Sequence, residues 1–398
     1  MLGFLSVIGG EEKIMIEAAS GDGGSFVLGE LGSILLVLGV VSYFASKFKF
    51  SVVPIFLLGG LFFGEGGVVA LSFSEEFLEL GARIGGILLL LLLGLEYTAD
   101  ELLESVKRRR SAGFIDFGFG FIPGFVVAIA LDWGVVGGLL LGGVSYVSSS
   151  GIATQFIRDG NLKGTVSSKI AVGILVVEDV VLAGYLPVVA AVSAGFGLVN
   201  GLISFAVALC ILGGALVLAA RGIHIKKSSL WFEDSMSLVL AVFGGALLAA
   251  GIAELVGFSG AVAAFLVGLM LTGDFAELAR VRLAPLRDLF AAIFFLFFGL
   301  SINPSDLGGM VGAALVLLIT SLAGKWVVAW WVGREVGEEG SVARVFLLLT
   351  PRGEFSIIIA ALAGGLSFAD SLQSITILYV ILSSVVGSVL LRFYRVKE

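Results

Sequence analysis

Long apolar runs recur along the whole sequence, and a run of about 20 such residues can cross a lipid bilayer as a helix. Of the 398 residues, 58% are hydrophobic, 14% are charged and 57 are glycine. The core of a soluble protein does not require this much apolar sequence, so the composition excludes soluble classes and indicates a polytopic membrane protein. We expect an all-α fold, because each helix satisfies its own backbone hydrogen bonds in lipid.

The chain divides into thirteen apolar segments that follow a short N-terminal tail. The tail, residues 1–25, lacks a basic region before an apolar core, so we expect an extramembrane segment and not a cleaved signal peptide. Residues 26–398 are expected to form one transmembrane domain. The segments cover residues 26–46, 51–64, 76–96, 112–131, 134–157, 165–194, 198–220, 234–256, 259–273, 284–300, 309–334, 342–366 and 371–393.

Basic residues divide the intervening loops into two classes. The loops after odd-numbered segments, with the C-terminal tail, hold 19 of the 24 lysines and arginines, and the even-numbered loops hold none. Because basic loops stay in the cytoplasm, the alternation predicts that the N-terminus lies outside and the C-terminus inside. The short chain without a transit-like segment favours the cell membrane over that of an organelle. The other basic residues are Lys13, Arg83, Lys169, Lys325 and Arg352.

Two adjacent carboxylates, Glu178 and Asp179, lie halfway along the apolar segment 165–194. Burying an ionised carboxylate there costs several kcal/mol unless it is paired or hydrated, and that cost is typical of ion or proton pathways. The alternative is that both groups only hold helices together through hydrogen bonds. We interpret the pair as the working centre of the protein.

Two basic residues, Lys325 and Arg352, also lie near the middle of their segments, so we expect both to have anionic partners inside the bundle. Adjacent residues on a helix point about 100° apart, so Glu178 and Asp179 cannot both face one partner. Lys325 can neutralise one carboxylate while the other faces an aqueous cavity. A carboxylate that binds either a proton or a cation, but never both, is sufficient for exchange.

Helix-breaking residues occur at corresponding positions of two halves of the chain. The run Ser148-Ser149-Ser150-Gly151 lies in the fifth segment, and Pro351 and Gly353 lie in the twelfth. These positions match if residues 26–194 and 234–393 are two inverted six-helix repeats joined by a linker helix at 198–220. Such a match indicates a transport site formed by discontinuous helices. For the serine run alone, an ordinary contact between membrane helices is an equal alternative.

Together these motifs resemble the Kef-type branch of the monovalent cation:proton antiporters, within the sodium/proton exchanger superfamily. The resemblance rests on motifs that follow the family's order along nearly the whole chain. They are Ser148 to Gly151, the acidic pair, Gly94-Leu95-Glu96, Phe294 to Leu300, Gly324-Lys325 and Arg352-Gly353-Glu354-Phe355.

The resemblance implies a thirteen-helix homodimeric antiporter in which a mobile core moves past a dimerisation panel by an elevator mechanism. It implies that Asp179 binds the monovalent cation or the proton, that Lys325 pairs with Glu178, and that Ser149 and Ser150 add ligands. Arg352 and Glu354 complete the expected site as charge-compensating groups. The transported ions are K⁺ or Na⁺ and H⁺, and no cofactor is expected.

The sequence also departs from the family's pattern. Glu178 stands where many Kef-type members have Gln and sodium-selective relatives often have Asp, so K⁺ is favoured only slightly over Na⁺. Kef proteins continue into a cytoplasmic nucleotide-binding domain, whereas this sequence ends at Glu398. A separate cytoplasmic regulatory subunit is therefore a further expectation.

Two other functional classes remain as alternatives. A cation channel needs a continuous pore with a ring of carbonyls or acids, and the sequence contains no motif typical of such a filter. An intramembrane enzyme could also use paired acids, but no nucleophile or metal-binding cluster accompanies them, and a lysine poised to neutralise one acid favours ion exchange. We expect a transporter surrounded by membrane lipid, not an enzyme and not a nucleic-acid binder.

Overall fold

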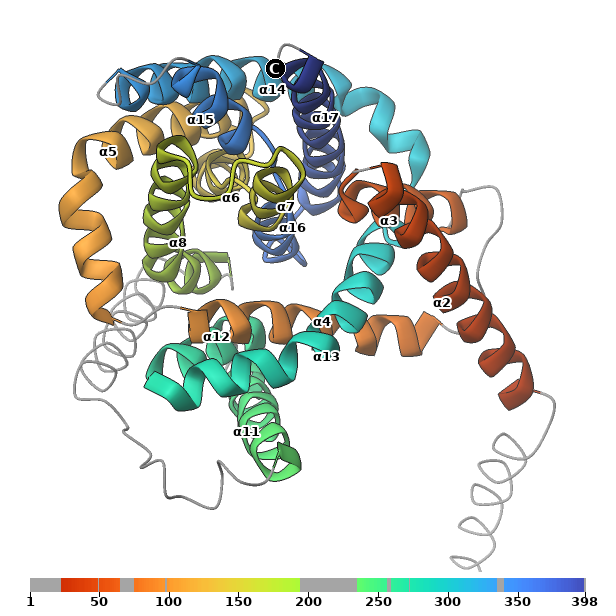
Figure 1. The fold of residues 1–398 in the computed structure, drawn as a ribbon. Helices are drawn as coiled ribbons and strands as arrows, with labels where there is room; N and C mark the ends of the chain where they lie inside the picture. The colour runs from red at the N-terminus through yellow and green to blue at the C-terminus, as the bar shows by residue number, and fades with distance from the viewer. Residues whose placement is uncertain are drawn as a thin grey trace, which may run out of the picture.

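The computed structural model describes residues 23–48, 50–64, 75–96, 99–193, 235–255, 259–271, 273–334 and 340–396. The regular elements of these residues are helices (Figure 1). Residues 1–22 of the expected N-terminal tail, and the whole expected linker helix at 198–220, lie outside the described residues. Nine of the described helical segments are long and apolar enough to cross a membrane. The all-α membrane fold expected from the sequence is therefore confirmed.

The helices carry the labels of Figure 1 and follow in chain order. They are α2 (Gly23–Phe48), α3 (Val52–Phe63), α4 (Glu75–Glu96), α5 (Ala99–Ala130), α6 (Gly134–Tyr146), α7 (Ser150–Asp159), α8 (Val166–Ser193), α11 (Ser235–Leu255), α12 (Gly260–Met270), α13 (Gly273–Leu300), α14 (Pro304–Gly333), α15 (Ser341–Leu349), α16 (Glu354–Ala361) and α17 (Ala369–Val396).

Twelve of the thirteen expected segments correspond to helices of the described residues, and the count of thirteen stays a prediction. Two expected loops are instead helical. Helix α5 begins at Ala99 and runs through the basic residues 107–110, and α13 begins at Gly273 and runs through residues 274–283. Both stretches are rich in Leu, Glu, Lys, Arg and Ala, which favour a helix even beyond the apolar span.

The two expected breaks are present. The fifth segment forms α6 and α7, separated by Val147 to Ser149, and the twelfth forms α15 and α16, separated by residues 350–353. The Ser149 side chain accepts a hydrogen bond from the Ile152 backbone N–H and thereby caps the start of α7. At the second break, Pro351 has no N–H to continue α15. The discontinuous helices predicted from these residues are confirmed.

The helices form two groups (Figure 1). We call α2, α3, α4, α11, α12 and α13 the panel, and α5, α6, α7, α8, α14, α15, α16 and α17 the core. Within the panel, α4 packs lengthwise against α12 and α13. Within the core, α5 and α14 enclose the broken helices together with α8 and α17. The two crossed breaks therefore lie inside the core, and α16 and α7 face the panel.

Paired glycines let panel helices touch backbone to backbone. A Cβ added to Gly94 of α4 would overlap the Phe265 carbonyl and lie 2.9 Å from the Gly268 Cα of α12. The reciprocal Cβ on Gly268 would lie 2.9 Å from the Gly94 Cα. In membranes, helix association depends on such close contact because lipid supplies little hydrophobic driving force. Gly94 of the motif Gly94-Leu95-Glu96 therefore has a packing function in the panel.

Candidate functional site

The two helix breaks cross in direct contact. The Ser149 backbone N–H donates to the Pro351 carbonyl at 2.8 Å, and the Ser356 hydroxyl donates to the Val144 carbonyl at 2.9 Å. The first bond joins the region between α6 and α7 to the region between α15 and α16, and the second joins α16 to the C-terminal part of α6. The crossing brings together the C-terminal ends of α6 and α15, which carry unsatisfied carbonyls and partial negative charge. It also brings together the N-terminal ends of α7 and α16.

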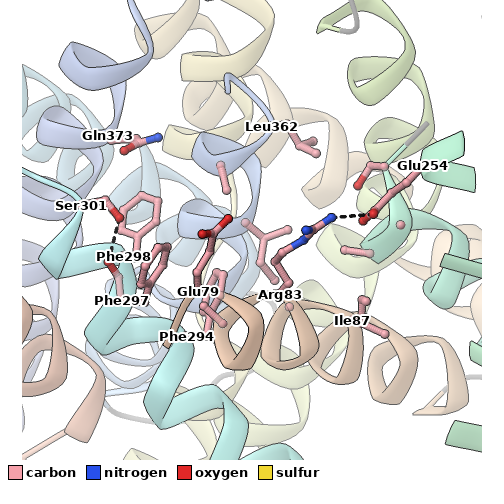
Figure 2. A pocket seen from close by; sticks show the side chains of 17 residues that line it. Glu79, Arg83, Ile87, Glu254, Phe294, Phe297, Phe298, Ser301, Leu362 and Gln373 are labelled. Carbon is pink, nitrogen blue, oxygen red and sulfur yellow. Dashed lines mark hydrogen bonds and ion pairs between the residues drawn. The ribbon is translucent and has the colours of Figure 1, made fainter. Parts of the chain in front are cut away.

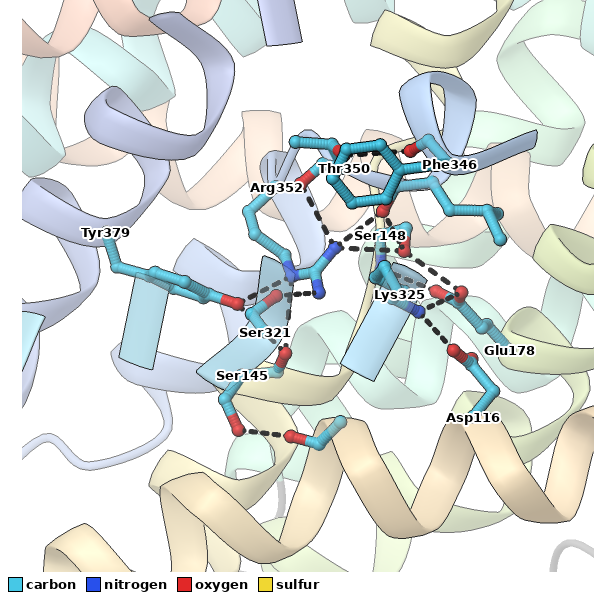
Figure 3. A network of polar contacts seen from close by, with 12 residues as sticks. Asp116, Ser145, Ser148, Glu178, Ser321, Lys325, Phe346, Thr350, Arg352 and Tyr379 are labelled. Carbon is cyan, nitrogen blue, oxygen red and sulfur yellow. Dashed lines mark hydrogen bonds and ion pairs between the residues drawn. The ribbon is translucent and has the colours of Figure 1, made fainter. Parts of the chain in front are cut away.

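Arg352 lies fully buried at the crossing and donates to oxygen atoms from several elements (Figure 3). Its Nε donates to the Ser145 carbonyl of α6 at 3.2 Å, and its Nη1 donates to the Leu349 carbonyl of α15 at 3.0 Å. Hydroxyl groups take its other bonds. They belong to Tyr379 at 2.8 Å from Nε, Ser148 at 3.0 Å from Nη1, and Ser321 at 2.6 Å from Nη2.

The expectation that Arg352 has an anionic partner is wrong for the described residues, where its guanidinium forms no ion pair. Its positive charge instead faces the carbonyl ends of α6 and α15, whose helix dipoles place negative charge there. Glu354 compensates the opposite ends, because it lies in the first turn of α16 and accepts from the Ser149 hydroxyl at 3.1 Å. The charges of Arg352 and Glu354 are therefore compensated mainly by the partial charges at helix ends, and less by each other.

Lys325 of α14 lies between two carboxylates (Figure 3). Its ammonium is 2.8 Å from Oε1 of Glu178 on α8 and 2.5 Å from Oδ1 of Asp116 on α5. All three residues are only 1% exposed. The contact expected between Lys325 and Glu178 is present, but the second counter-ion was not anticipated.

The sequence-based prediction does not include Asp116, because it considers only the charged residues in the middle of segments 6, 11 and 12. The available signal was a single acid within the apolar segment 112–131. Its Oδ2 is buried without a hydrogen-bond partner among the described residues. Such an unsatisfied charged oxygen is costly, so its presence requires an explanation beyond packing.

Both carboxylate oxygens of Glu178 are occupied by neighbouring groups. Oε2 accepts from the Ser148 backbone N–H at 2.5 Å, and Oε1 accepts from the Ser148 hydroxyl at 3.0 Å as well as from Lys325. The Ser148 hydroxyl in turn accepts from Arg352. Glu178 is thus fixed to the helix crossing through both of its carboxylate oxygens, an arrangement that suits charge balance with Lys325. Its expected function as an ion ligand stays a prediction.

Asp179, the next residue on α8, is buried with 4% exposure. Because neighbouring positions on a helix point about 100° apart, its carboxylate leaves α8 in a different direction from that of Glu178. Of the two serines expected as further ligands, Ser149 bonds Glu354 and caps α7, whereas Ser150 lines a cavity. The assignment of Asp179, Ser149 and Ser150 as ligands stays a prediction.

A cavity of about 670 Å³ lies between the core and the panel, on the side where the basic residues lie. We call it the basic-side cavity. Ser150, Thr154 and Glu354 line it from the core, and Glu96 lines it from the end of α4. The other charged residues along its wall include Arg158, Arg280 and Arg287. Charged and hydroxyl groups make this cavity suitable for water and small ions.

A second cavity, of about 410 Å³, lies at the opposite ends of α4, α13 and α16 (Figure 2). We call it the far-side cavity. Arg83 of α4 and Glu254 of α11 form an ion pair of 2.6 Å at its edge, and Gln373 lines it from α17. The phenyl rings of Phe294 and Phe298 line its wall. The described part of the protein therefore has a cavity with polar residues at each end of the interface between core and panel.

Comparison with known families gives a match over nearly the whole chain. The family model described as "Sodium/hydrogen exchanger, transmembrane" matches residues 32–397. This range includes both helix breaks, the acidic pair and Lys325.

Relatives of this chain include two bacterial antiporter subunits and a potassium-efflux protein. The K(+)/H(+) antiporter subunit KhtU of Bacillus subtilis is 31% identical over 90% of this chain and 91% of the relative. The ammonium/H(+) antiporter subunit AmhT of Alkalihalophilus pseudofirmus is 30% identical over 91% and 92%. The glutathione-regulated potassium-efflux system protein KefC of Salmonella typhimurium is 28% identical over 86% of this chain but only 55% of KefC.

A solved structure has a similar fold. The sodium proton antiporter MjNhaP1 of Methanocaldococcus jannaschii aligns with a TM-score of 0.68, covering 92% of this chain and 99% of the other. The sequence identity is 20%, so this likeness shows the fold alone.

Proposed function

The chain belongs to the sodium/hydrogen exchanger family of cation:proton antiporters, and we propose that it exchanges K⁺ or Na⁺ for protons at Asp179. The buried acidic pair carries this proposal. Glu178 is held by Lys325 and Ser148, so the second acid of the pair is the better candidate to exchange its proton for a cation. A carboxylate oxygen is a hard ligand that suits either alkali cation.

K⁺ is the favoured cation in this proposal. Two of the relatives are named for potassium, and AmhT is named for ammonium, a cation of similar size to K⁺. The neighbour named for sodium is similar in fold only. Exchange of Na⁺ is the alternative within the same family, and ammonium belongs in any test of selectivity.

The proposed mechanism is alternating access by movement of the core past the panel. This mechanism is supported by the two cavities, which lie close to each other along α4 and α16. On α4, Ile87 is the last residue that lines the far-side cavity, and Leu89 is the first that lines the basic-side cavity. On α16, Phe355 lines the basic-side cavity and Ile358 lines the far-side cavity. Three residues of helix rise about 4.5 Å. A core displacement of a few such steps would transfer a bound ion from one cavity to the other.

We further propose a homodimer in the cell membrane, with the N-terminus outside and the basic-side cavity open to the cytoplasm. The alternation of basic residues supports this orientation. The names of KhtU and AmhT include the word subunit, which supports a separate regulatory partner for this chain as well. The transported ions are the substrates, and no cofactor is included in the proposal.

The proposal is tested with purified protein in liposomes that carry an imposed pH gradient, a pH-sensitive dye and a clamped membrane potential. K⁺, Na⁺, Li⁺ and ammonium are added in turn. We expect one cation to dissipate the gradient in the wild type and not in Asp179→Asn, although the variant folds. Asp370→Asn, at the exposed start of α17, is the matched control and should behave as wild type. Exchange that survives in Asp179→Asn would remove Asp179 from the mechanism.

A further inference from the structure

The buried charges of the described residues do not balance. The charged side chains that are buried there are three acids, Asp116, Glu178 and Asp179, and two bases, Lys325 and Arg352. With all five ionised, these buried side chains sum to one net negative charge, and we call this sum the charge of the core. One proton or one monovalent cation neutralises it, and a core without either remains charged.

The net charge of the core affects whether it can move. An assembly with a net charge is more costly to carry through the low-dielectric interior of a membrane than one whose charges cancel. A core with one net negative charge should therefore move when it is loaded with one cation or one proton, and resist moving when it is empty. Movement of the empty core is the step that would let a cation leak without proton exchange.

Asp116 supplies the charge that creates this imbalance. Without it, the remaining acids Glu178 and Asp179 would be matched by Lys325 and Arg352, and the empty core would be neutral. The Lys325 ammonium, 2.5 Å from Oδ1, supports the ionised state, whereas burial of Oδ2 without a partner opposes it, so the count holds at a pH high enough for Asp116 to lose its proton. Glu178 faces the same ammonium from α8, so two acids share this one base, and Lys325 is the base that pairs with Asp116 in the described residues.

We infer that Asp116 is a positioning residue that sets the coupling of the antiporter, by keeping the empty core one positive charge short of neutrality. Exchange is then one cation for one proton and carries no net charge. The inference rests on the proposed function, because it assigns a stoichiometry to exchange at Asp179. A structural function alone would leave this ratio unchanged when Asp116 is replaced.

The experiment measures cation efflux and proton influx together in proteoliposomes above neutral pH, with K⁺ or, where the wild type prefers it, Na⁺. In the wild type we expect equal fluxes that do not change when the potential is stepped by about 100 mV. In Asp116→Asn the empty core is neutral and the cation-loaded core is positive. Cation flux should then exceed proton flux at least about twofold, and should respond to the potential by up to about fiftyfold, the effect of one charge crossing it.

Matched variants separate charge from structure. Glu178→Gln removes a different negative charge from the same core and should give the same excess of cation flux. It tests the effect of net charge even if Asp116→Asn does not fold. The double variant Asp116→Asn with Lys325→Gln restores one net negative charge and should restore equal fluxes. Asp132→Asn, just beyond the end of α5 with a backbone φ of 59° that asparagine tolerates, should match the wild type.

The possible results are decisive. A wild-type flux ratio different from one overturns the inference, as does a folded Asp116→Asn or Glu178→Gln variant that keeps equal, potential-independent fluxes. Absence of exchange in the wild type with every cation would instead contradict the proposed function.

Discussion

The ammonium of Lys325 lies 2.8 Å from Glu178 Oε1, and both side chains are almost completely buried. Residues 147 positions apart on α14 and α8 are joined by this contact. The same ammonium reaches Asp116, so helices from both halves of the chain depend on one positive charge. The stability of the core should therefore respond strongly to changes at these three residues.

Lys325→Ala should destabilise the protein strongly. Removing one partner of a buried ion pair typically costs about 3–5 kcal/mol, because it leaves an uncompensated charge, and here two carboxylates lose their counter-ion. Thermal unfolding of the purified protein in detergent checks this expectation. Lys169→Ala, which removes an exposed lysine from α8, is the control and should unfold near the wild-type temperature. An unchanged unfolding temperature in Lys325→Ala would contradict the ion pair.

The loss caused by Lys325→Ala should be relieved in two steps. Glu178→Gln should recover only part of the stability, because Asp116 remains uncompensated, and adding Asp116→Asn should recover more. Residues that share a network typically show coupling energies of about 0.5–3 kcal/mol. The unfolding temperatures of the single, double and triple variants measure these energies. Strictly additive losses would show that the three residues act independently.

Gly94→Ala should destabilise the panel, whereas Gly244→Ala should not. The added methyl at Gly94 would overlap α12 at the Phe265 carbonyl and Gly268, and overpacking typically costs about 1–3 kcal/mol. At Gly244 of α11 the same methyl meets no atom within 4 Å, so the better helix propensity of alanine should stabilise slightly. Thermal unfolding compares the two variants. Equal effects would mean that α4 and α12 do not approach as closely as described.

Cysteine labelling should distinguish the two cavities by side. Thr154→Cys lines the basic-side cavity and Gln373→Cys lines the far-side cavity. With Cys210, the single native cysteine, replaced by serine, we expect a membrane-impermeant maleimide to label Thr154→Cys from the cytoplasm and Gln373→Cys from outside. Vesicles of both orientations provide the comparison. Labelling of both positions from one side would contradict the orientation derived from the basic residues.

Much of the fold could be predicted from residue patterns because the bilayer imposes strong local constraints. Apolar length locates membrane helices, and proline, glycine and serine at matching positions locate the two breaks. The helical extensions of α5 and α13 were missed, because loss of hydrophobicity marks the membrane boundary and not the end of a helix. The α13 extension, residues 273–283, carries Arg280, so it also decides which charges line the basic-side cavity.

The partners of the buried charges were only partly predictable. A lysine and an acidic pair in the middle of apolar segments must have partners. Because few charged residues lie there, the contact between Lys325 and Glu178 could be predicted. The partners of Arg352 could not be predicted, because backbone carbonyls and hydroxyls that satisfy a guanidinium leave no charge in the sequence to reveal them. Only the crossing of α6 with α15 places those carbonyls around it.

The sequence by itself determined the membrane class, the two broken helices and the acidic pair, because each is set by neighbouring residues and by the cost of charge in lipid. The tertiary structure alone decided that Asp116 shares Lys325 with Glu178 and that a cavity with polar residues lies at each end of the interface between core and panel. These features depend on how helices distant in the chain are placed against each other. No local pattern encodes that placement, so the net charge of the core became countable only when the fold was known.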